Sequence, residues 1–160
     1  MQSINLPNLT QWGEMYETFR GCTNLQTVNL PNLTGEILST GAFQDCTSLQ
    51  TIELKISTDP VRHWSPFYGC TSLTKIKAPL AHIMGFGKCN KLRTLILPQT
   101  DKVAALENST AFKDTLIGKN LNSGIYVPRV LLNDYKTATN WVTLSNYIYA
   151  IEDYPDITGG

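Results

Sequence analysis

Apolar and polar residues alternate in short segments that recur along the chain. In residues 25–30, Val28 and Leu30 are apolar, whereas Thr27 and Asn29 are polar. The same alternation returns in residues 49–54 and 73–78. A period of two predicts a β-strand with one face on the core and the other in water. We therefore expect a series of short strands, each with one polar face.

A second motif precedes each strand and consists of an aromatic residue, a cysteine and a leucine. Four complete copies begin at Phe19, Phe43, Phe67 and Phe86, and a fifth, from Phe112, has Thr in place of the cysteine. Successive cysteines are separated by 24, 24 and 19 residues (22 to 46, 46 to 70, 70 to 89). Self-similarity at this period indicates a solenoid, and the spacing lies within or near that of leucine-rich repeats.

The sequence thus predicts a leucine-rich repeat solenoid with parallel strands on its concave face. The connecting segments are too short for stable helices, so we expect short helical turns or irregular arcs on the convex face. Proline lacks an N–H and ends strand pairing. It follows most of the predicted strands, as Pro7, Pro31, Pro79, Pro98 and Pro128.

Two regions are expected. Residues 1–128 form the solenoid of about five repeats, the first of them truncated because residues 4–7 match only the end of a repeat. This start suggests a segment of a longer protein. Residues 129–160 form a small α/β C-terminal cap and tail, with an amphipathic helix over 129–139 and bulky residues at 147–151. Such a cap shields the last coil of a solenoid from water.

The four cysteines share one repeat position and predict a structural ladder of buried side chains: Cys22, Cys46, Cys70 and Cys89. Their parallel directions disfavour disulfides, and without a C-x-x-C pair no zinc site is expected. His63 and His82 have no H-E-x-x-H context and are expected in loops. We therefore expect no catalytic residue, no metal, no cofactor and no enzymatic activity.

Charge restricts the possible partners. Thirteen basic residues balance thirteen acidic ones, which argues against nucleic acid, and no apolar stretch is long enough for membrane insertion. Residues 55–93 nevertheless carry seven basic residues and one acidic residue, whereas acidic residues predominate in residues 1–54. This pattern fits either a solvated surface or an anionic partner, such as a glycan or an acidic protein face.

The outward positions of the strands are the candidate contact residues. The equivalent outward positions of successive strands form one column, and the outward positions two residues earlier form a second column beside it. From these positions we select Asn29, Glu53, Lys75, Lys77, Ile96 and Tyr126. Ile96 and Tyr126 are apolar where the equivalent residues are polar. Either they are exposed as part of a binding hot spot, or the cap helix covers them.

The motif F-x-x-C-T-x-L-x-x-I-x-L-P resembles the BspA-like, or treponemal-type, leucine-rich repeat over about residues 3–128. The closing segment, residues 125–141, is similar to those that end such arrays in gut bacteria and their phages. The resemblance implies a surface-exposed or secreted bacterial protein, and hence an extracellular or cell-surface location, although the first residues show no signal peptide. Members of this family mostly bind host proteins, matrix or other cells.

The resulting hypothesis is a non-enzymatic adhesion or interaction module that binds a protein, with a glycan as a possible ligand. One alternative is a phage tail component that binds a receptor. The other is a carbohydrate-binding appendage of a larger enzyme, with Trp12 beside Tyr16 and Trp64 beside Tyr68 as stacking faces for sugars. The sequence upstream of Met1 distinguishes these three hypotheses.

Overall fold

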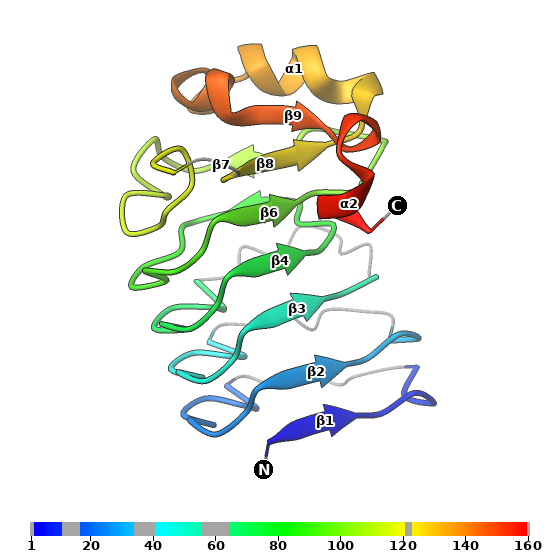
Figure 1. The fold of residues 1–160 in the computed structure, drawn as a ribbon, viewed down its shortest axis with the longest axis vertical. Coiled ribbons are helices and arrows are strands. Elements are labelled where there is room, and N and C mark those ends of the chain that lie inside the picture. Colours follow the sequence, from blue (N-terminus) through cyan, green and yellow to red (C-terminus); the bar gives the residue numbers. More distant parts are fainter. Residues whose placement is uncertain (1, 11–16, 34–40, 56–64, 121–122, 160) are drawn as a thin grey trace.

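The computed structural model describes residues 2–10, 17–33, 41–55, 65–120 and 123–159. Its strands lie above one another like the rungs of a ladder (Figure 1). The rungs are β1 (Ser3–Asn5), β2 (Thr27–Asn29), β3 (Thr51–Glu53), β4 (Lys75–Lys77), β6 (Thr94–Ile96), β8 (Gly124–Val127) and β9 (Ile148–Ala150). In the described part of the chain they form one parallel seven-stranded sheet, in this order. The predicted leucine-rich repeat solenoid is confirmed.

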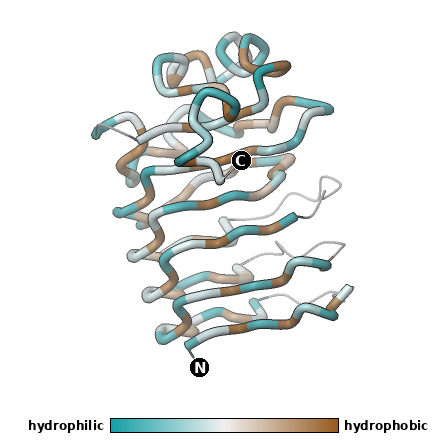
Figure 2. The backbone as a smooth tube through the Cα atoms, turned by 45° about the vertical axis from the view of Figure 1, so that its right-hand side comes forward, coloured by the Kyte–Doolittle hydropathy of each residue, from teal (hydrophilic) through white to brown (hydrophobic). Residues whose placement is uncertain are grey.

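The register between strands places equivalent residues of successive repeats side by side. Ile52 pairs with Ile76, Ile76 with Leu95, and Leu95 with Ile125, and all four side chains are buried. Figure 2 shows the corresponding hydrophobic positions recurring from coil to coil. A single coil could not bury these residues alone, so the stacking of repeats creates the core.

Phenylalanine rings fill each coil on the side opposite the strands. The Phe43 ring stacks on Phe19 at 5.3 Å and on Phe67 at 5.9 Å between centroids. Higher in the array, Phe112 lies 5.3 Å from Phe86 and 6.1 Å from Trp141 of the cap. The repeated aromatic position is therefore a packing column that ends against the cap.

The described arcs before the strands are turns without helix, the second of the two forms expected for them. Backbone hydrogen bonds join each arc to the next coil: the Phe43 N–H donates to the Pro66 carbonyl (3.0 Å), and the Asp45 N–H donates to the Tyr68 carbonyl (2.8 Å). These bonds satisfy backbone groups that regular secondary structure would otherwise satisfy. The arcs are thus irregular in shape but fixed in position.

The residue before each cysteine has a left-handed backbone conformation. Its φ is 69° at Gly21, 59° at Asp45, 76° at Gly69 and 60° at Lys88. Glycine adopts this conformation without steric cost, whereas other residues do so at a cost. The two glycines at this position therefore provide a matched pair for measuring the strain.

Replacing Gly69 with alanine is expected to lower the free energy of unfolding by about 3 kcal/mol, and the same change at Gly21 by about 1 kcal/mol. Both sites carry the backbone strain. At Gly69, however, the new Cβ would lie 2.2 Å from the Asp45 Oδ1, while at Gly21 it would meet nothing within 4 Å. Urea unfolding checks the difference, and equal effects would show that Asp45 moves aside freely.

The C-terminal cap continues and closes the sheet. It contains the 3₁₀ helix η1 (Arg129–Leu131), α1 (Leu132–Thr137), the 3₁₀ helix η2 (Trp141–Tyr147), β9, the 3₁₀ helix η3 (Ile151–Asp153) and α2 (Pro155–Thr158). Strand β9 pairs with β8, and α1 lies across the end of the array (Figure 1). The Tyr135 hydroxyl accepts from the Ala104 N–H (2.9 Å), and the Trp141 Nε1–H donates to the Ala104 carbonyl (2.7 Å). The predicted amphipathic segment is therefore a short 3₁₀ turn followed by α1.

The expectation that His82 lies in a loop is wrong. His82 belongs to β5 (His82–Ile83), which pairs in parallel with β7 (Ala105–Leu106) in a second, small sheet. The two strands are only two residues long, and such a segment carries too little alternation for the sequence pattern to indicate a strand.

Candidate functional site

The outward surface of the large sheet, here called the open face, carries the polar side chains of the strands. On β1, β2 and β3 the outward residues are exposed, and on β4 they are partly exposed. They form two columns, one with Ser3, Thr27, Thr51 and Lys75 and one with Asn5, Asn29, Glu53 and Lys77. The structure thus brings the predicted residues Asn29, Glu53, Lys75 and Lys77 together on one surface.

Side chains in the second column contact one another along the solenoid axis. The Asn29 Nδ2 donates to the Asn5 Oδ1 at 2.9 Å, and the Lys77 Nζ lies 3.2 Å from the Glu53 Oε1. An ion pair this exposed adds little stability. Its main consequence is that Glu53 and Lys77 place opposite charges side by side at the upper border of the exposed region.

The segment after β9, which contains η3 and α2 and is here called the tail, covers the sheet from β4 onward and so limits the open face. The Lys75 Nζ donates to the Ile157 carbonyl (2.6 Å), and the Lys77 Nζ donates to the Thr158 carbonyl (3.1 Å). Both acceptors lie at the end of α2, where carbonyls have no partner within the helix and lysine commonly supplies one. In Figure 1, α2 lies beside the end of β6. Both lysines therefore hold the tail in place.

The expectation that Ile96 and Tyr126 are exposed contact residues is wrong. Their side chains are 0% and 1% exposed. The Tyr126 ring lies 5.6 Å from Tyr149 on β9 and 5.5 Å from Tyr154 in the tail. Burial, and next the neighbouring Tyr149 and Tyr154, raise the pKa of Tyr126. The cover of Tyr126 is thus β9 and the tail rather than the cap helix. Ile96 is buried on β6, where it pairs with Lys77 and Tyr126.

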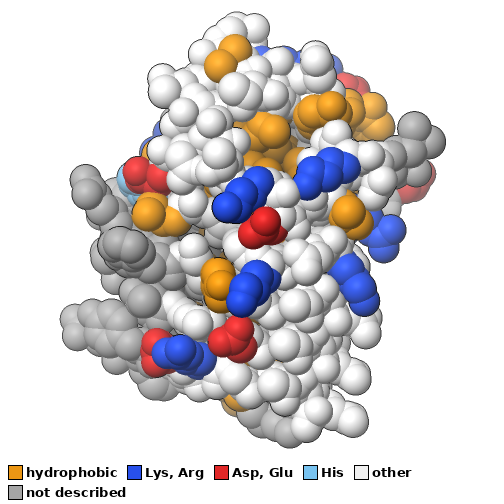
Figure 3. All heavy atoms as spheres, turned by 90° about the vertical axis from the view of Figure 1, so that its left-hand side faces the viewer, with side chains coloured by type: hydrophobic (Ala, Val, Ile, Leu, Met, Phe, Trp, Pro, Cys, Tyr) orange, Lys and Arg blue, Asp and Glu red, His pale blue; other side chains and the backbone are white. Residues whose placement is uncertain are grey.

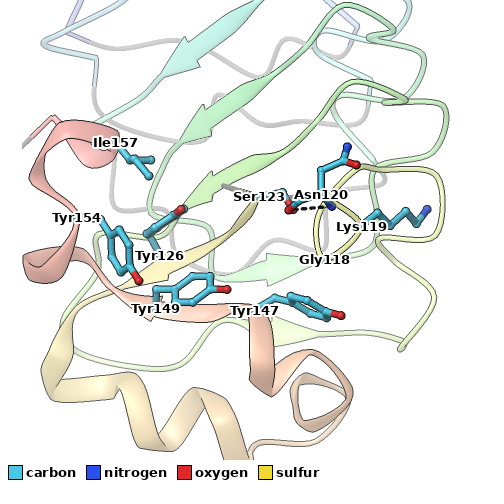
Figure 4. A pocket seen from close by; sticks show the side chains of 9 residues that line it. All are labelled: Gly118, Lys119, Asn120, Ser123, Tyr126, Tyr147, Tyr149, Tyr154 and Ile157. Atoms are coloured by element: carbon cyan, nitrogen blue, oxygen red, sulfur yellow. Dashed lines mark hydrogen bonds between the residues drawn. The ribbon is translucent and has the colours of Figure 1, made fainter.

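A groove that was not predicted lies between β8, β9, the tail and the turn around residues 118–120. It has a volume of about 420 Å³ and is lined by Gly118, Lys119, Asn120, Ser123, Tyr126, Tyr147, Tyr149, Tyr154 and Ile157. Figure 4 shows the four tyrosines following one another along it. The alternation of Tyr147 and Tyr149 with the buried Ile148 and Ala150 is the sequence signal that could have revealed β9 and this row.

The four cysteines were predicted to form a ladder of buried side chains, but Cys22 is only partly buried. All four thiols are free, and three are buried. The Sγ of Cys46, Cys70 and Cys89 each donates at 3.0 Å to the carbonyl of the phenylalanine in the preceding repeat. In the fifth repeat the Thr115 hydroxyl donates instead to the Phe112 carbonyl of its own repeat (2.8 Å). The ladder therefore ends where cysteine is lost.

The buried cysteines are expected to resist alkylation in the native protein. Burial raises the pKa of Cys46 and of Cys89 to about 12 and that of Cys70 further, so almost no reactive thiolate forms at pH 8. Cys22 is only partly buried and should react first with iodoacetamide. Mass spectrometry after a timed reaction at pH 8 checks the order. Labelling of Cys70 at the rate of Cys22 would contradict the ladder.

The described residues do not gather a metal-binding group. Among them, no cluster of three or more His, Cys, Asp or Glu side chains could hold an ion. The His82 Nδ1 lies 3.5 Å from the Glu107 Oε1, which makes a pair but not such a cluster. In the same part of the chain, no helix is sufficiently long and apolar to cross a membrane. Trp12, Tyr16, His63 and Trp64 lie outside the described residues.

The turns that precede the strands form another face, shown in Figure 3, where acidic and basic side chains are interspersed. Two local contacts hold such groups there. Arg20 pairs with Glu17, and the Lys88 Nζ lies 5.2 Å from the centre of the Tyr68 ring. Exposed pairs of this kind are typical of a solvated surface. The open face, with its aligned polar columns, is the more ordered candidate for recognition.

Parallel strands, coil-spanning ladders and a terminal cap define the protein as a leucine-rich repeat solenoid. A family model for the BspA type leucine rich repeat region matches residues 1–116 in six copies, so the chain belongs to this family. No curated protein matches the chain.

Proposed function

We propose that this chain is a non-enzymatic interaction module of the adhesion type, which binds a protein partner through the open face of β1, β2 and β3. The observation that carries the proposal is the exposure of polar side chains on three adjacent parallel strands, next to strands whose equivalent positions the tail covers. Solenoids use surfaces of this kind for binding. Membership of the BspA-type family supports a role at a cell surface or in secreted form.

The chemistry of the open face suits recognition of a protein. Thr27, Asn29 and Thr51 present hydroxyl and amide groups that both donate and accept hydrogen bonds. Their short side chains stand on a hydrogen-bonded sheet, so binding immobilises few rotatable bonds. The adjacent charges of Glu53 and Lys77 can orient a partner with complementary charges. The proposed interaction is therefore non-covalent and requires no cofactor.

The test is a screen of the purified chain against an array of extracellular proteins. A double variant, Thr27→Arg with Thr51→Arg, introduces bulky charges in the middle of the open face. The matched control is Thr23→Arg, because Thr23 is equally exposed but lies in the turn before β2. We expect wild type and control to bind the same proteins and the double variant to lose at least about tenfold in affinity.

Either of two results would contradict the proposal: no protein is bound by the wild type, or the double variant binds as well as the control. Lys75 and Lys77 are unsuitable for this test, since they also hold the tail through the Ile157 and Thr158 carbonyls. Circular dichroism of each variant verifies that the sheet is intact. The phage-receptor and sugar-appendage alternatives stay predictions.

A further inference from the structure

The tyrosine-lined groove is a second surface with the character of a binding site. The Tyr147 and Tyr154 side chains at its two ends are each 37% exposed, and Tyr149 lies between them, partly buried. Figure 4 shows the rings arranged along the groove, with Asn120 near its Tyr147 end and the Lys119 side chain extending away from the rings. A groove of about 420 Å³ is within the usual size range of ligand sites. Exposed aromatic rings beside polar groups are typical of binding hot spots.

Two of the rings pack closely on glycine residues. A Cβ at Gly118 would lie 2.8 Å from the Tyr147 ring, and a Cβ at Gly124 would lie 2.6 Å from the Tyr149 ring. Tyr154 stands edge-on to Tyr149, at 62° and 5.4 Å. The groove therefore presents slots between tilted rings rather than one flat platform. Because these slots already exist before binding, a ligand would bind with little loss of side-chain conformational entropy.

The polar side chains of the groove carry no negative charge, since none of its nine lining residues has a carboxylate. The phenol hydroxyls and the Asn120 amide can donate as well as accept hydrogen bonds. The Lys119 Nζ already donates to the Lys113 carbonyl (2.6 Å), and the Ser123 hydroxyl donates to the Asn120 carbonyl within its own turn (2.6 Å). A ligand with carbonyl acceptors for the hydroxyl and amide donors, and with compact apolar groups that enter the slots, matches this groove.

We propose that this groove binds a proline-rich segment of a partner protein in the polyproline II conformation. Proline has no N–H, and the extended helix exposes its carbonyl acceptors and its compact rings. Aromatic-lined grooves recognise such segments because the helix is already formed before binding. A sugar fits less well, since its ring faces stack best on a flat platform, which the tilted rings of this groove do not form. The site is distinct from the open face of β1, β2 and β3.

Fluorescence anisotropy with fluorescein-labelled decaproline tests the proposal, with a glycine–serine decapeptide as the control probe. We expect saturable binding of decaproline alone. Tyr147→Ala should weaken it at least about tenfold, and Tyr147→Phe should retain most of it because the ring remains. Tyr68→Ala is the matched control, since Tyr68 is a partly buried tyrosine outside this groove. The variant Thr27→Arg with Thr51→Arg should bind decaproline like wild type.

Three results would overturn the proposal. They are a failure of decaproline to bind, binding of decaproline by Tyr147→Ala as tight as by Tyr68→Ala, and displacement of decaproline by cellohexaose at equal concentration. The last result would assign the groove to glycans. Because the open-face variant is measured on the same probe, failure here is distinguishable from failure of the proposed function.

Discussion

Replacing Phe43 with alanine is expected to lower the free energy of unfolding by about 3–5 kcal/mol, a large part of the stability of a small domain. Phe43 is 0% exposed, and its ring stacks between those of Phe19 and Phe67. Its carbonyl also accepts the hydrogen bond from the Cys70 Sγ. Alanine keeps the carbonyl but leaves a cavity in the aromatic column, which Phe19 and Phe67 cannot fill because backbone hydrogen bonds fix the arcs that carry them.

Phe19→Ala is the matched control for this prediction. Phe19 stacks on Phe43 but is partly exposed, so its removal should cost about half as much. Urea unfolding followed by circular dichroism measures both variants. Equal losses at the two positions would show that the column contributes through local contacts at each ring and not through stacking of successive coils.

Replacing Trp141 with alanine is expected to cost about 3–5 kcal/mol as well. Trp141 is 1% exposed and lies against two aromatic rings, 6.1 Å from Phe112 and 5.1 Å from Tyr135. Its indole N–H donates to the Ala104 carbonyl, which the change would leave without this partner in a buried place. Loss of the indole therefore opens the end of the aromatic column and detaches the cap.

The neighbouring residue Val142 provides the control, because it is 55% exposed. Val142→Ala should change the free energy of unfolding by no more than about 0.5 kcal/mol. Thermal and urea unfolding of both variants give the comparison. If Trp141→Ala were as mild as Val142→Ala, the cap would not be part of the cooperative unit.

The repeats could be predicted from sequence because each carries its whole pattern locally. The alternation around Val28 and the cysteine spacing fix strand, arc and register together, since a parallel solenoid places equivalent residues next to each other. The cysteine ladder follows from the same argument. Sequence reasoning therefore identified the polar columns of the open face before the structure placed them.

The tail could not be predicted in this way. Lys75 and Lys77 hold it by hydrogen bonds to the Ile157 and Thr158 carbonyls. Every residue has a backbone carbonyl, so the sequence does not indicate which carbonyl accepts such a bond. The contact also spans about eighty residues, so no periodicity reports it. Tyr154, which lies against Tyr126, belongs to the same tail, so the burial of Tyr126 could not be predicted from the repeat pattern.

The tail divides the outward surface of the sheet into two parts. Below it, on β1, β2 and β3, short polar side chains remain exposed. Beside it, four tyrosines line a groove that has no carboxylate. The two proposed sites thus follow from one structural feature, because the same segment that ends the open face also supplies Tyr154 to the groove.

The central claim is that the open face of β1, β2 and β3 is the binding surface. Amide hydrogen exchange of the chain, alone and bound to the strongest protein partner from the array, tests it most directly. We predict slower exchange in peptides that contain residues 2–10, 23–33 and 47–55, and unchanged exchange in residues 86–92. Protection confined to the turns or to α1, with β1, β2 and β3 unaffected, would contradict the claim.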